Sequence, residues 1–402
     1  MKVSIYLTNF GCFMKSDLLN NSIKILVINF LIIIISCSSP SEPQPQDIEI
    51  AKALAIKKLL LSSFDVPENQ YPIFTNSTKK WVLTTSTSWT SGFYPGCLWY
   101  GYKLSGNAQL KNMAEQFTQG LFEEQYTTSH HDVGFMIFNS YGLGYKITGN
   151  ESYKNVILQA AKSLSTRFNE NVGCIQSWNG EFQVIIDNMM NLELLFWASK
   201  NGGDSTYYKM AVSHANKTIQ NHIREDGSSF HVVHYDPETG DVMRKRTAQG
   251  YSDNSTWARG QAWGIYGFTM CYRETGNIEY LNTAVKMADY YISHLPEDSI
   301  PYWDFNLPEN YERDFKDASA ATIALSGLIE LNSYVNSSTY ENVINNTFNS
   351  LINYYIITES SKSGIIDHCA YHANDPNPDY WDSATIWGDY YFLEALDRIN
   401  AD

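Results

Sequence analysis

The chain has 402 residues, of which 44% are hydrophobic, 18% charged and 14% aromatic, and this composition excludes a disordered polymer. With 28 Lys and Arg against 43 Asp and Glu, the formal net charge is -15, which argues against nucleic acid as the main partner. The 28 Tyr, 19 Phe and 10 Trp suit a protein that stacks on sugar rings, and equally an aromatic-lined structural core.

Residues 1–37 have the pattern of a secretory signal, because two lysines precede an apolar run over residues 25–35 that is about half the ~20 residues of a membrane-spanning helix. The run ends in Ile34-Ile35-Ser36-Cys37, which resembles a bacterial lipobox with Cys37 as the lipidated residue. A Pro-, Ser- and Gln-rich tether follows over residues 38–46. We therefore expect an exported, periplasmic or outer-membrane-anchored lipoprotein that meets the membrane only through its lipid. An ordinary signal peptide and a short uncleaved anchor are the alternatives.

Four cysteines outside this segment are widely spaced and form no Cys-x-x-Cys motif. They are Cys97, Cys174, Cys271 and Cys369. This spacing demands no disulfide and lacks a zinc signature, so buried free thiols and disulfides both stay open. His368 and His372 are spaced for one helical turn, but two prolines follow closely and disfavour a helical metal site. We expect no metal.

Three segments repeat one pattern: Tyr102–Asn107, Tyr145–Asn150 and Tyr272–Asn277. Each ends an apolar-periodic stretch in Gly-Asn and is followed by another such stretch. A glycine that ends one helix, followed by a short polar link into the next, is the chemistry of a C-cap and an N-cap. The three segments therefore predict the turns of three helical hairpins.

The same periodicity predicts two looser hairpins and two terminal helices: 182–200 with 207–224, 318–335 with 340–357, and 47–64 and 384–398 at the ends. The ends of an open solenoid need polar caps, whereas both terminal helices are apolar on one face, as expected if they close on each other. The predicted fold class is all-α, a single (α/α)6 barrel over residues 47–402, with an open solenoid as the alternative. We expect the aromatic loops 81–96, 226–253 and 296–316 to line its mouth.

Asp187 precedes a helix that is apolar on nearly every side, with Asn188 and Asn191 as polar companions. Burial disfavours an ionised carboxylate and raises its pKa, which is what a general acid needs near neutral pH. Asp132 opens a second helix of this inner type. Two such carboxylates at the same open end of a barrel are the residues that usually catalyse the cleavage of glycosidic bonds. The structural alternative for each is a helix N-cap.

A third group of candidate site residues consists of His231, Gln249, Trp257, Arg259 and Trp263. An arginine held between indoles offers charge and planar donors for a carboxylate in a partly dry site. The structural alternative is tryptophan packing in an inner helix, with Arg259 capping the C-terminus of a neighbouring helix.

Four motifs occur in the order HDVGF, IIDNMMNLELLFWAS, HVVHYDPETG and QGYSDNSTWARGQAWGIYGF, and together they resemble the unsaturated glucuronyl hydrolases of glycoside hydrolase family 88. The segment WTSGFYPG, which begins at Trp89, and the closing SATIWGDYYFLEAL also fit, so the resemblance spans roughly Ala51 to Leu396. The resemblance implies an (α/α)6 barrel, in agreement with the helix count, and a reaction without metal or organic cofactor. The implied substrate is an anionic oligosaccharide whose non-reducing end is a 4,5-unsaturated uronic acid left by a polysaccharide lyase.

The resemblance also implies roles for single residues. Asp187 matches the acid/base that protonates C4 of the unsaturated sugar and helps to deliver water to C5, after which the hemiketal opens and the glycosidic bond breaks. Asp132 matches a second carboxylate that bonds the sugar and assists Asp187. Substrate-binding positions are matched by His231, Gln249, Trp257, Arg259 and Trp263, and Trp89 is expected to stack on the sugar.

Two other functions stay open from the sequence. One is a neighbouring family with the same barrel that acts on unsaturated galacturonyl-rhamnose, and the other is a non-catalytic lipoprotein that captures glycans. The parent polysaccharide also stays open, because residues 364–380 contain no clear copy of the Ser/Lys motif of family members that accept sulfated glycosaminoglycans. Neither the linkage preference nor the oligomeric state follows from the sequence.

Overall fold

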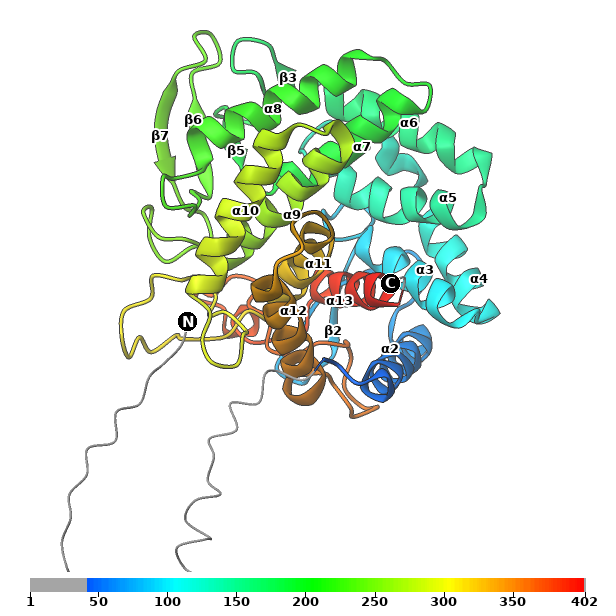
Figure 1. Cartoon of the computed structure of the whole chain (residues 1–402). Coiled ribbons are helices and arrows are strands. Elements are labelled where there is room, and N and C mark those ends of the chain that lie inside the picture. The colour runs from blue at the N-terminus through cyan, green and yellow to red at the C-terminus, as the bar shows by residue number, and fades with distance from the viewer. Residues whose placement is uncertain (1–41, 401–402) are drawn as a thin grey trace, which may run out of the picture. The chain divides into compact units, whose positions relative to one another are not determined.

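Six helices that are buried on most sides form an inner ring in the computed structural model of the chain, which describes residues 42–400 (Figure 1). They are α3 (Phe93–Ser105), the π-helix η2 (Gly134–Gly142) continuing as α5 (Leu143–Thr148), α7 (Asn188–Lys200), α9 (Ala258–Thr275), α11 (Ala318–Val335) and α13 (Ile386–Ile399). Successive inner helices contact each other, and α13 contacts α3, so the ring is closed. The predicted (α/α)6 barrel is confirmed, and the open-solenoid alternative is wrong.

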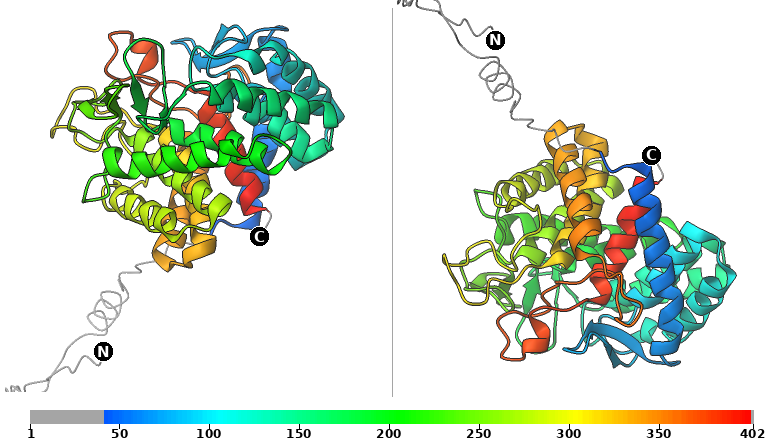
Figure 2. Two further views of the ribbon diagram at one scale, coloured as in Figure 1. Left: turned by 90° about the horizontal axis from the view of Figure 1, so that it is seen from above. Right: turned by 90° about the horizontal axis from the view of Figure 1, so that it is seen from below.

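A second layer of helices surrounds this ring. In chain order they are α2 (Pro45–Asp65), α4 (Ala108–Gln119), α6 (Glu151–Ser165), α8 (Thr206–His222), α10 (Ile278–Ser293) and α12 (Ser338–Ser350), which continues as the π-helix η3 (Leu351–Tyr355). The first of these, α2, lies beside α13, as the view from below shows (Figure 2). The terminal helices therefore form the sixth hairpin. Within the described residues, no helix is long and apolar enough to cross a membrane.

The three Gly-Asn turns have the predicted capping geometry. Gly106, Gly149 and Gly276 end their inner helices with left-handed φ angles of 68°, 68° and 69°. The asparagine after each glycine accepts a hydrogen bond from a backbone N–H in the first turn of the following outer helix. Local capping chemistry is therefore sufficient to set three of the six hairpins.

Two predicted boundaries differ from the structure. The helix expected over residues 182–200 begins only at Asn188, because the strand β5 (Gln183–Ile185) precedes it and pairs with β6 (Val232–Tyr235). A short apolar run is compatible with a helix or a strand, and only this tertiary pairing decides. The tether expected over residues 38–46 overlaps α2, which begins at Pro45, a residue type favoured in the first helical turn. The predicted signal and lipobox lie outside the described residues.

Short strands and 3-10 turns fill the connections. They are β1 (Tyr71–Thr75), β2 (Trp81–Thr84), η1 (Phe122–Tyr126), β3 (Phe168–Asn169), β4 (Cys174–Ile175), β7 (Val242–Arg246) and η4 (Pro378–Tyr380). The strands β5, β6 and β7 form an antiparallel sheet, and β1–β2 and β3–β4 form two-stranded pairs. Because β5 ends at Ile185, this sheet leads the chain directly into Asp187 at the start of α7.

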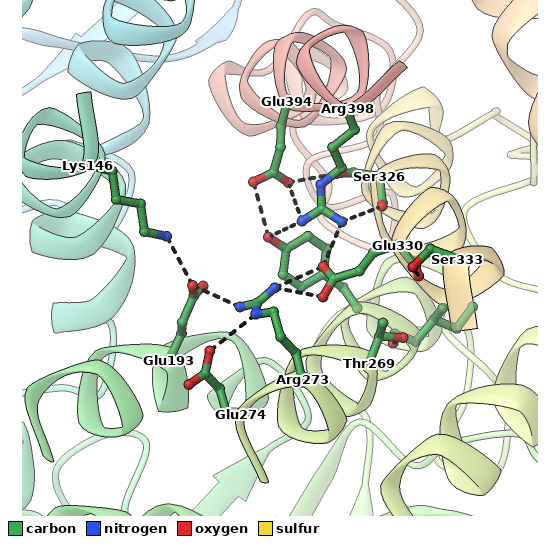
Figure 3. A network of polar contacts seen from close by, with 12 residues as sticks. Lys146, Glu193, Thr269, Arg273, Glu274, Ser326, Glu330, Ser333, Glu394 and Arg398 are labelled. Carbon is green, nitrogen blue, oxygen red and sulfur yellow. Dashed lines mark hydrogen bonds and ion pairs between the residues drawn. The ribbon is translucent and has the colours of Figure 1, made fainter. Parts of the chain in front are cut away.

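A series of polar contacts links neighbouring inner helices between their middles and their C-terminal ends (Figure 3). Glu193 of α7 accepts hydrogen bonds from Lys146 of α5 at 3.2 Å and from Arg273 of α9 at 2.9 Å. Arg273 also donates to Glu330 of α11 at 2.8 Å. Arg398 of α13 donates to the same Glu330 at 2.7 Å. Ion pairs therefore connect four successive pairs of neighbouring inner helices.

Glu394 of α13 completes this series toward the first inner helix. Its carboxylate accepts hydrogen bonds from the hydroxyls of Tyr100 of α3 at 2.9 Å and Tyr266 of α9 at 3.1 Å. All six inner helices therefore contribute to one connected set, which we name the polar belt: Tyr100, Lys146, Glu193, Tyr266, Arg273, Glu330, Glu394 and Arg398. Cations near the C-terminal ends of helices also complement the helix dipoles there.

Candidate functional site

A cavity lies at the opposite end of the barrel, where the inner helices begin. Its lining residues are Trp89, His131, Asp132, Trp178, Ile185, Asp187, Gln249, Trp257 and Arg259. Six of the eight predicted site residues line it, and the other two, His231 and Trp263, are buried next to it. Helix N-termini carry partial positive charge, so this end of the barrel favours an anionic ligand in spite of the net negative charge of the chain.

Asp187 occupies the position before α7 but does not cap that helix, because its side chain accepts no capping hydrogen bond. The residue is 9% exposed, and its Oδ2 has no hydrogen-bond partner among the described residues. Burial raises the pKa of Asp187 to about 7, with Arg259 opposing and the charge of Asp132 reinforcing the rise. The capping alternative for Asp187 is therefore wrong, and the carboxyl retains its proton close to neutral pH.

Asp132 is buried nearby but has the opposite electrostatic setting. Its Oδ1 lies 3.3 Å from Nε2 of His131, and its Oδ2 lies 3.3 Å from Nδ1 of His130. Burial opposes the charge on this carboxylate, but His131, His130 and Arg167 outweigh it and lower the pKa of Asp132. The cavity therefore holds one carboxyl poised to donate a proton and one that stays ionised, which is the asymmetry that acid/base chemistry needs.

His231 presents a hydrogen-bond donor to Asp187. Its Nδ1 accepts hydrogen bonds from the backbone N–H groups of Ala248 at 3.2 Å and Gln249 at 3.3 Å. Burial lowers the pKa of His231 well below its usual value, so the ring is neutral and its proton resides on Nε2. This nitrogen lies 3.7 Å from Oδ2 of Asp187, and the imidazole stacks on Trp257 with ring centroids 4.4 Å apart.

Arg259 is held between indoles, as expected, although the second indole differs. Its guanidinium lies 4.5 Å from the ring centroid of Trp257 and 5.3 Å from that of Trp387 in α13. Trp263 instead lies below the cavity, 1% exposed, and packs against Phe135 with ring centroids 5.3 Å apart. Its indole N–H favours the ionised form of Asp187. Trp263 is therefore placed to support the acid rather than to stack on a ligand.

The guanidinium of Arg259 has less freedom than the sequence suggests. One terminal nitrogen donates to Asp317 at 3.0 Å, the other donates to Gln249 at 2.6 Å, and both also donate to backbone carbonyls of residues 370–371. All four terminal N–H groups are used, so the expected free donors for a substrate carboxylate are absent. Residues 370–371 lie in a loop, so the helix-capping alternative is wrong as well. Arg259 contributes positive charge at the cavity and fixes the amide of Gln249.

Sequence reasoning missed three cavity residues, Trp178, His131 and the apolar Ile185. Trp178 directly precedes Asn179-Gly180, and Asn-Gly is the strongest short-range signal for a hairpin turn. Gly180 has a φ of 99°, which such a turn requires. An aromatic residue beside this turn was therefore a detectable candidate. His131 is fully buried beside Asp132, and nothing in the pattern distinguished it from its exposed-loop neighbours.

Of the three loops expected at the mouth, 81–96 and 226–253 contribute Trp89 and Gln249, and the third contributes no lining residue. The loop 296–316 packs behind the cavity, where Asp304 accepts a hydrogen bond from the backbone of Tyr251 at 2.9 Å. A polar residue that anchors one loop against another cannot be distinguished by composition from one that binds a ligand.

The histidines considered for a metal do not converge. His368 pairs with Asp382 at 2.8 Å, whereas Nε2 of His372 lies 3.1 Å from the carbonyl of Ala248. Over residues 42–400, no group of three or more His, Cys, Asp or Glu side chains is arranged to hold a metal ion. The cysteines of these described residues are free and buried: Cys97, Cys174, Cys271 and Cys369.

Known proteins resemble the chain over its whole barrel. The model of the family described as Glycosyl Hydrolase Family 88 matches residues 60–394, which include every cavity residue. An unsaturated glucuronyl hydrolase of Formosa agariphila is 45% identical over 323 residues, which cover 78% of this chain and 80% of that protein. One of Bacillus sp. (strain GL1) is 36% identical over 368 residues, which cover 87% and 95%. A crystal structure of an unsaturated glucuronyl hydrolase specific for heparin superimposes with a TM-score of 0.84 at 36% identity, over 89% of this chain and 97% of that one.

Proposed function

The chain belongs to glycoside hydrolase family 88, and from this premise we propose how its cavity residues divide the work. The enzyme is a glycoside hydrolase that releases a 4,5-unsaturated uronic acid from the non-reducing end of oligosaccharides left by a polysaccharide lyase. It does so by hydrating the vinyl ether of that sugar. Membership of this family decides against the neighbouring galacturonyl-rhamnose family and against a non-catalytic binding protein.

We propose that Asp187 is the acid and then the base of this hydration. One observation carries the proposal: Asp187 is a buried carboxyl in a cavity lined by three tryptophans, its Oδ2 has no hydrogen-bond partner among the described residues, and burial raises its pKa to about 7. Its proton passes to C4 of the alkene, and the positive charge that develops at C5 is shared with the ring oxygen. Water then adds to C5 and returns one proton to the carboxylate of Asp187. The hemiketal at C5 opens to a ketone, and the hemiacetal left at C1 expels the aglycone as an alcohol.

We propose that Asp132 stays ionised through this sequence. A carboxylate beside the cavity stabilises the positive charge at C5 and accepts a hydrogen bond from a sugar hydroxyl. The indoles of Trp89, Trp178 and Trp257 form apolar walls that stack on the sugar and limit the entry of water. Gln249 and His231 supply polar contacts, and Arg259 supplies positive charge against the uronate.

The test is turnover of a panel of unsaturated disaccharides made by lyases from chondroitin, heparin and ulvan. The expected result is loss of the ultraviolet absorbance of the 4,5-double bond together with release of the aglycone sugar. Binding of these disaccharides by calorimetry without loss of absorbance would overturn the proposal. The ratio of kcat/KM values across the panel identifies the parent polysaccharide.

We also propose that the enzyme is exported and anchored through a lipid on Cys37. The support is the apolar run and lipobox of the sequence. In addition, Glu42 lies beside Ile329 and Ile399 near the C-terminal ends of α11 and α13, which is the end of the barrel opposite the mouth. Incorporation of labelled fatty acid and recovery in the membrane fraction should both be lost in Cys37→Ser, and equal labelling of the variant would contradict the proposal.

A further inference from the structure

Asn191 connects the helix that follows Asp187 to the segment that carries Asp132. It lies one helical turn after Asp187 in α7 and is 1% exposed. Its Oδ1 accepts a hydrogen bond from the backbone N–H of Phe135 at 2.8 Å. Its Nδ2 lies 3.3 Å from Nδ1 of His131. A buried amide that has a separate partner for its oxygen and its nitrogen has a fixed orientation.

This orientation decides the tautomer of His131. Because Oδ1 of Asn191 is used by a backbone donor, the group that faces His131 is the NH2, which can only donate. Nδ1 of His131 must therefore accept, and a neutral ring then carries its proton on Nε2. Burial lowers the pKa of His131 to about 4, so the ring is neutral at working pH. Nε2 lies 3.3 Å from Oδ1 of Asp132 without the geometry of a hydrogen bond, and it has no hydrogen-bond partner among the described residues.

The close approach of Asn191 depends on the residue opposite to it. A Cβ atom on Gly134 would lie 2.5 Å from Oδ1 and 2.8 Å from Cα of Asn191, which no side chain can occupy. Gly134 begins the π-helix η2, two residues after Asp132. The segment His131-Asp132-Val133-Gly134 is therefore shaped to receive an amide from α7, and π-helical segments are frequent at functional sites.

We infer that Asn191 is a positioning residue of this enzyme, whose side-chain amide fixes the tautomer of His131 so that the N–H of Nε2, and not a lone pair, faces the carboxylate of Asp132. The inference rests on the proposed roles of Asp132 and Asp187. The arrangement repeats the one at Asp187, where backbone N–H groups fix Nδ1 of His231 as an acceptor. Each carboxylate is thus faced by a neutral imidazole in the same tautomer, and Asn191 supplies at Asp132 what the backbone supplies at Asp187.

The N–H fixed on Nε2 of His131 favours the ionised form of Asp132. The charged and titratable groups around Asp132 are His130 and His131 beside it, Arg167 after α6, Asp187 before α7 and Tyr371 from the loop before α13. Without a fixed Nε2 donor, burial dominates at Asp132 and its pKa rises. Asp132 is still ionised near pH 7, where Asp187 titrates, so its repulsion on Asp187 is unchanged. Only the acid limb of the pH–rate profile should therefore move.

The experiment compares pH–rate profiles of kcat/KM for wild type, Asn191→Leu and His131→Phe on an unsaturated disaccharide. In both variants we expect the acid limb to move up by about one pH unit and the alkaline limb to stay in place, with kcat roughly tenfold lower. The double variant should show no further shift, because both changes remove the same donor. Gln261→Ala is the matched control: this buried amide of α9 donates to the carbonyls of Gly227 and Met287 and does not contact the acid pair.

The control should lower the melting temperature and keep the wild-type pH profile. A wild-type profile in Asn191→Leu, with a melting temperature lowered as in the control, would assign Asn191 a merely structural role and overturn the inference. Failure of the proposed function has a different signature, because Asp132→Asn and Asp187→Asn would then turn over substrate like the wild type. If those two variants lose activity and Asn191→Leu keeps its profile, only the positioning role is lost.

Discussion

The two ends of the barrel both bury carboxylates among the same six helices, but they do so with opposite results. In the polar belt, Glu193 lies between Lys146 and Arg273, and these cations outweigh burial and lower its pKa to about 2. At the mouth, no Lys or Arg among the described residues forms an ion pair with Asp187. Burial therefore raises the pKa of Asp187 to about 7. The same desolvation therefore yields a permanent anion at one end and a proton donor at the other.

The difference shows which end stabilises the ring and which end is prepared for a substrate. The belt connects all six inner helices and pairs its carboxylates with neighbouring donors. Removal of one cation therefore leaves a carboxylate with less compensation for its charge. The mouth keeps polar atoms without hydrogen-bond partners, Oδ2 of Asp187 and Nε2 of His231 among them. Unsatisfied buried groups reduce stability and are characteristic of sites that a ligand completes.

The largest expected effect is loss of catalysis without loss of stability. Asp187→Asn keeps the shape of the side chain and removes the transferable proton, so kcat/KM should fall by about 10²–10⁴-fold. The melting temperature should stay level or rise, because a buried ionisable group is removed. Absorbance assays and thermal unfolding of both proteins measure the two quantities. Retained turnover would show that another group is the acid.

The converse change at the belt should lower stability without altering the chemistry. Arg273→Ala removes the cation that the half-buried Glu193 and Glu330 share. Lys146 and Arg398 still pair with these carboxylates, so the loss should be on the order of 2 kcal/mol. Lys103→Ala, at an exposed single pair with Asp397, is the matched control and should cost at most about 1 kcal/mol. Denaturant unfolding gives both values. Equal losses in the two variants would show that the belt adds nothing beyond isolated ion pairs.

The pH dependence of stability should differ in sign between the ends. Folded protein keeps the proton of Asp187 up to about pH 7, whereas the unfolded chain loses it near pH 4, so stability falls as pH rises between these values. The stability of Asp187→Asn relative to wild type should therefore increase with pH, on the order of 2 kcal/mol from pH 5 to 8. For Glu193 the folded pKa is lowered, so its contribution is present above about pH 4.5 and is lost toward pH 2.

Thermal unfolding across this pH range measures the difference for Asp187→Asn and for Glu193→Gln. The deficit of Glu193→Gln should shrink on acidification through this window. A stability difference that is independent of pH in both variants would contradict the contrast between the two ends.

The smallest effect concerns the wall of the cavity. Trp178→Ala removes one stacking surface and leaves both carboxyls in place, so KM should rise roughly tenfold while kcat changes little. Steady-state kinetics on the preferred disaccharide measures this split. An unchanged KM would show that the ring does not touch the sugar, and a large fall in kcat would show that the Asn179-Gly180 turn positions the acid.

The amino-acid sequence by itself predicted the helical hairpins and marked both carboxylates as candidates. Gly106 with Asn107, and the equivalent pairs, act within a few residues of the chain, so capping chemistry predicts these turns without any tertiary information. Asp187 and Asp132 were identifiable because a charged residue in an apolar helical context is costly unless it is used. These signals are local, and local signals can be read from one sequence.

Only the tertiary structure decided which groups surround those carboxylates. Asn191 meets His131 across 60 residues, Arg259 meets Asp317 across 58, and the belt joins Tyr100 to Glu394 across 294. The strand β5 replaced a predicted helical turn for the same reason, because its partner β6 lies far along the chain. A polar side chain could pair with many residues far along the chain. Closure of the ring brings the ends of six helices together and thereby decides which of these partners it meets.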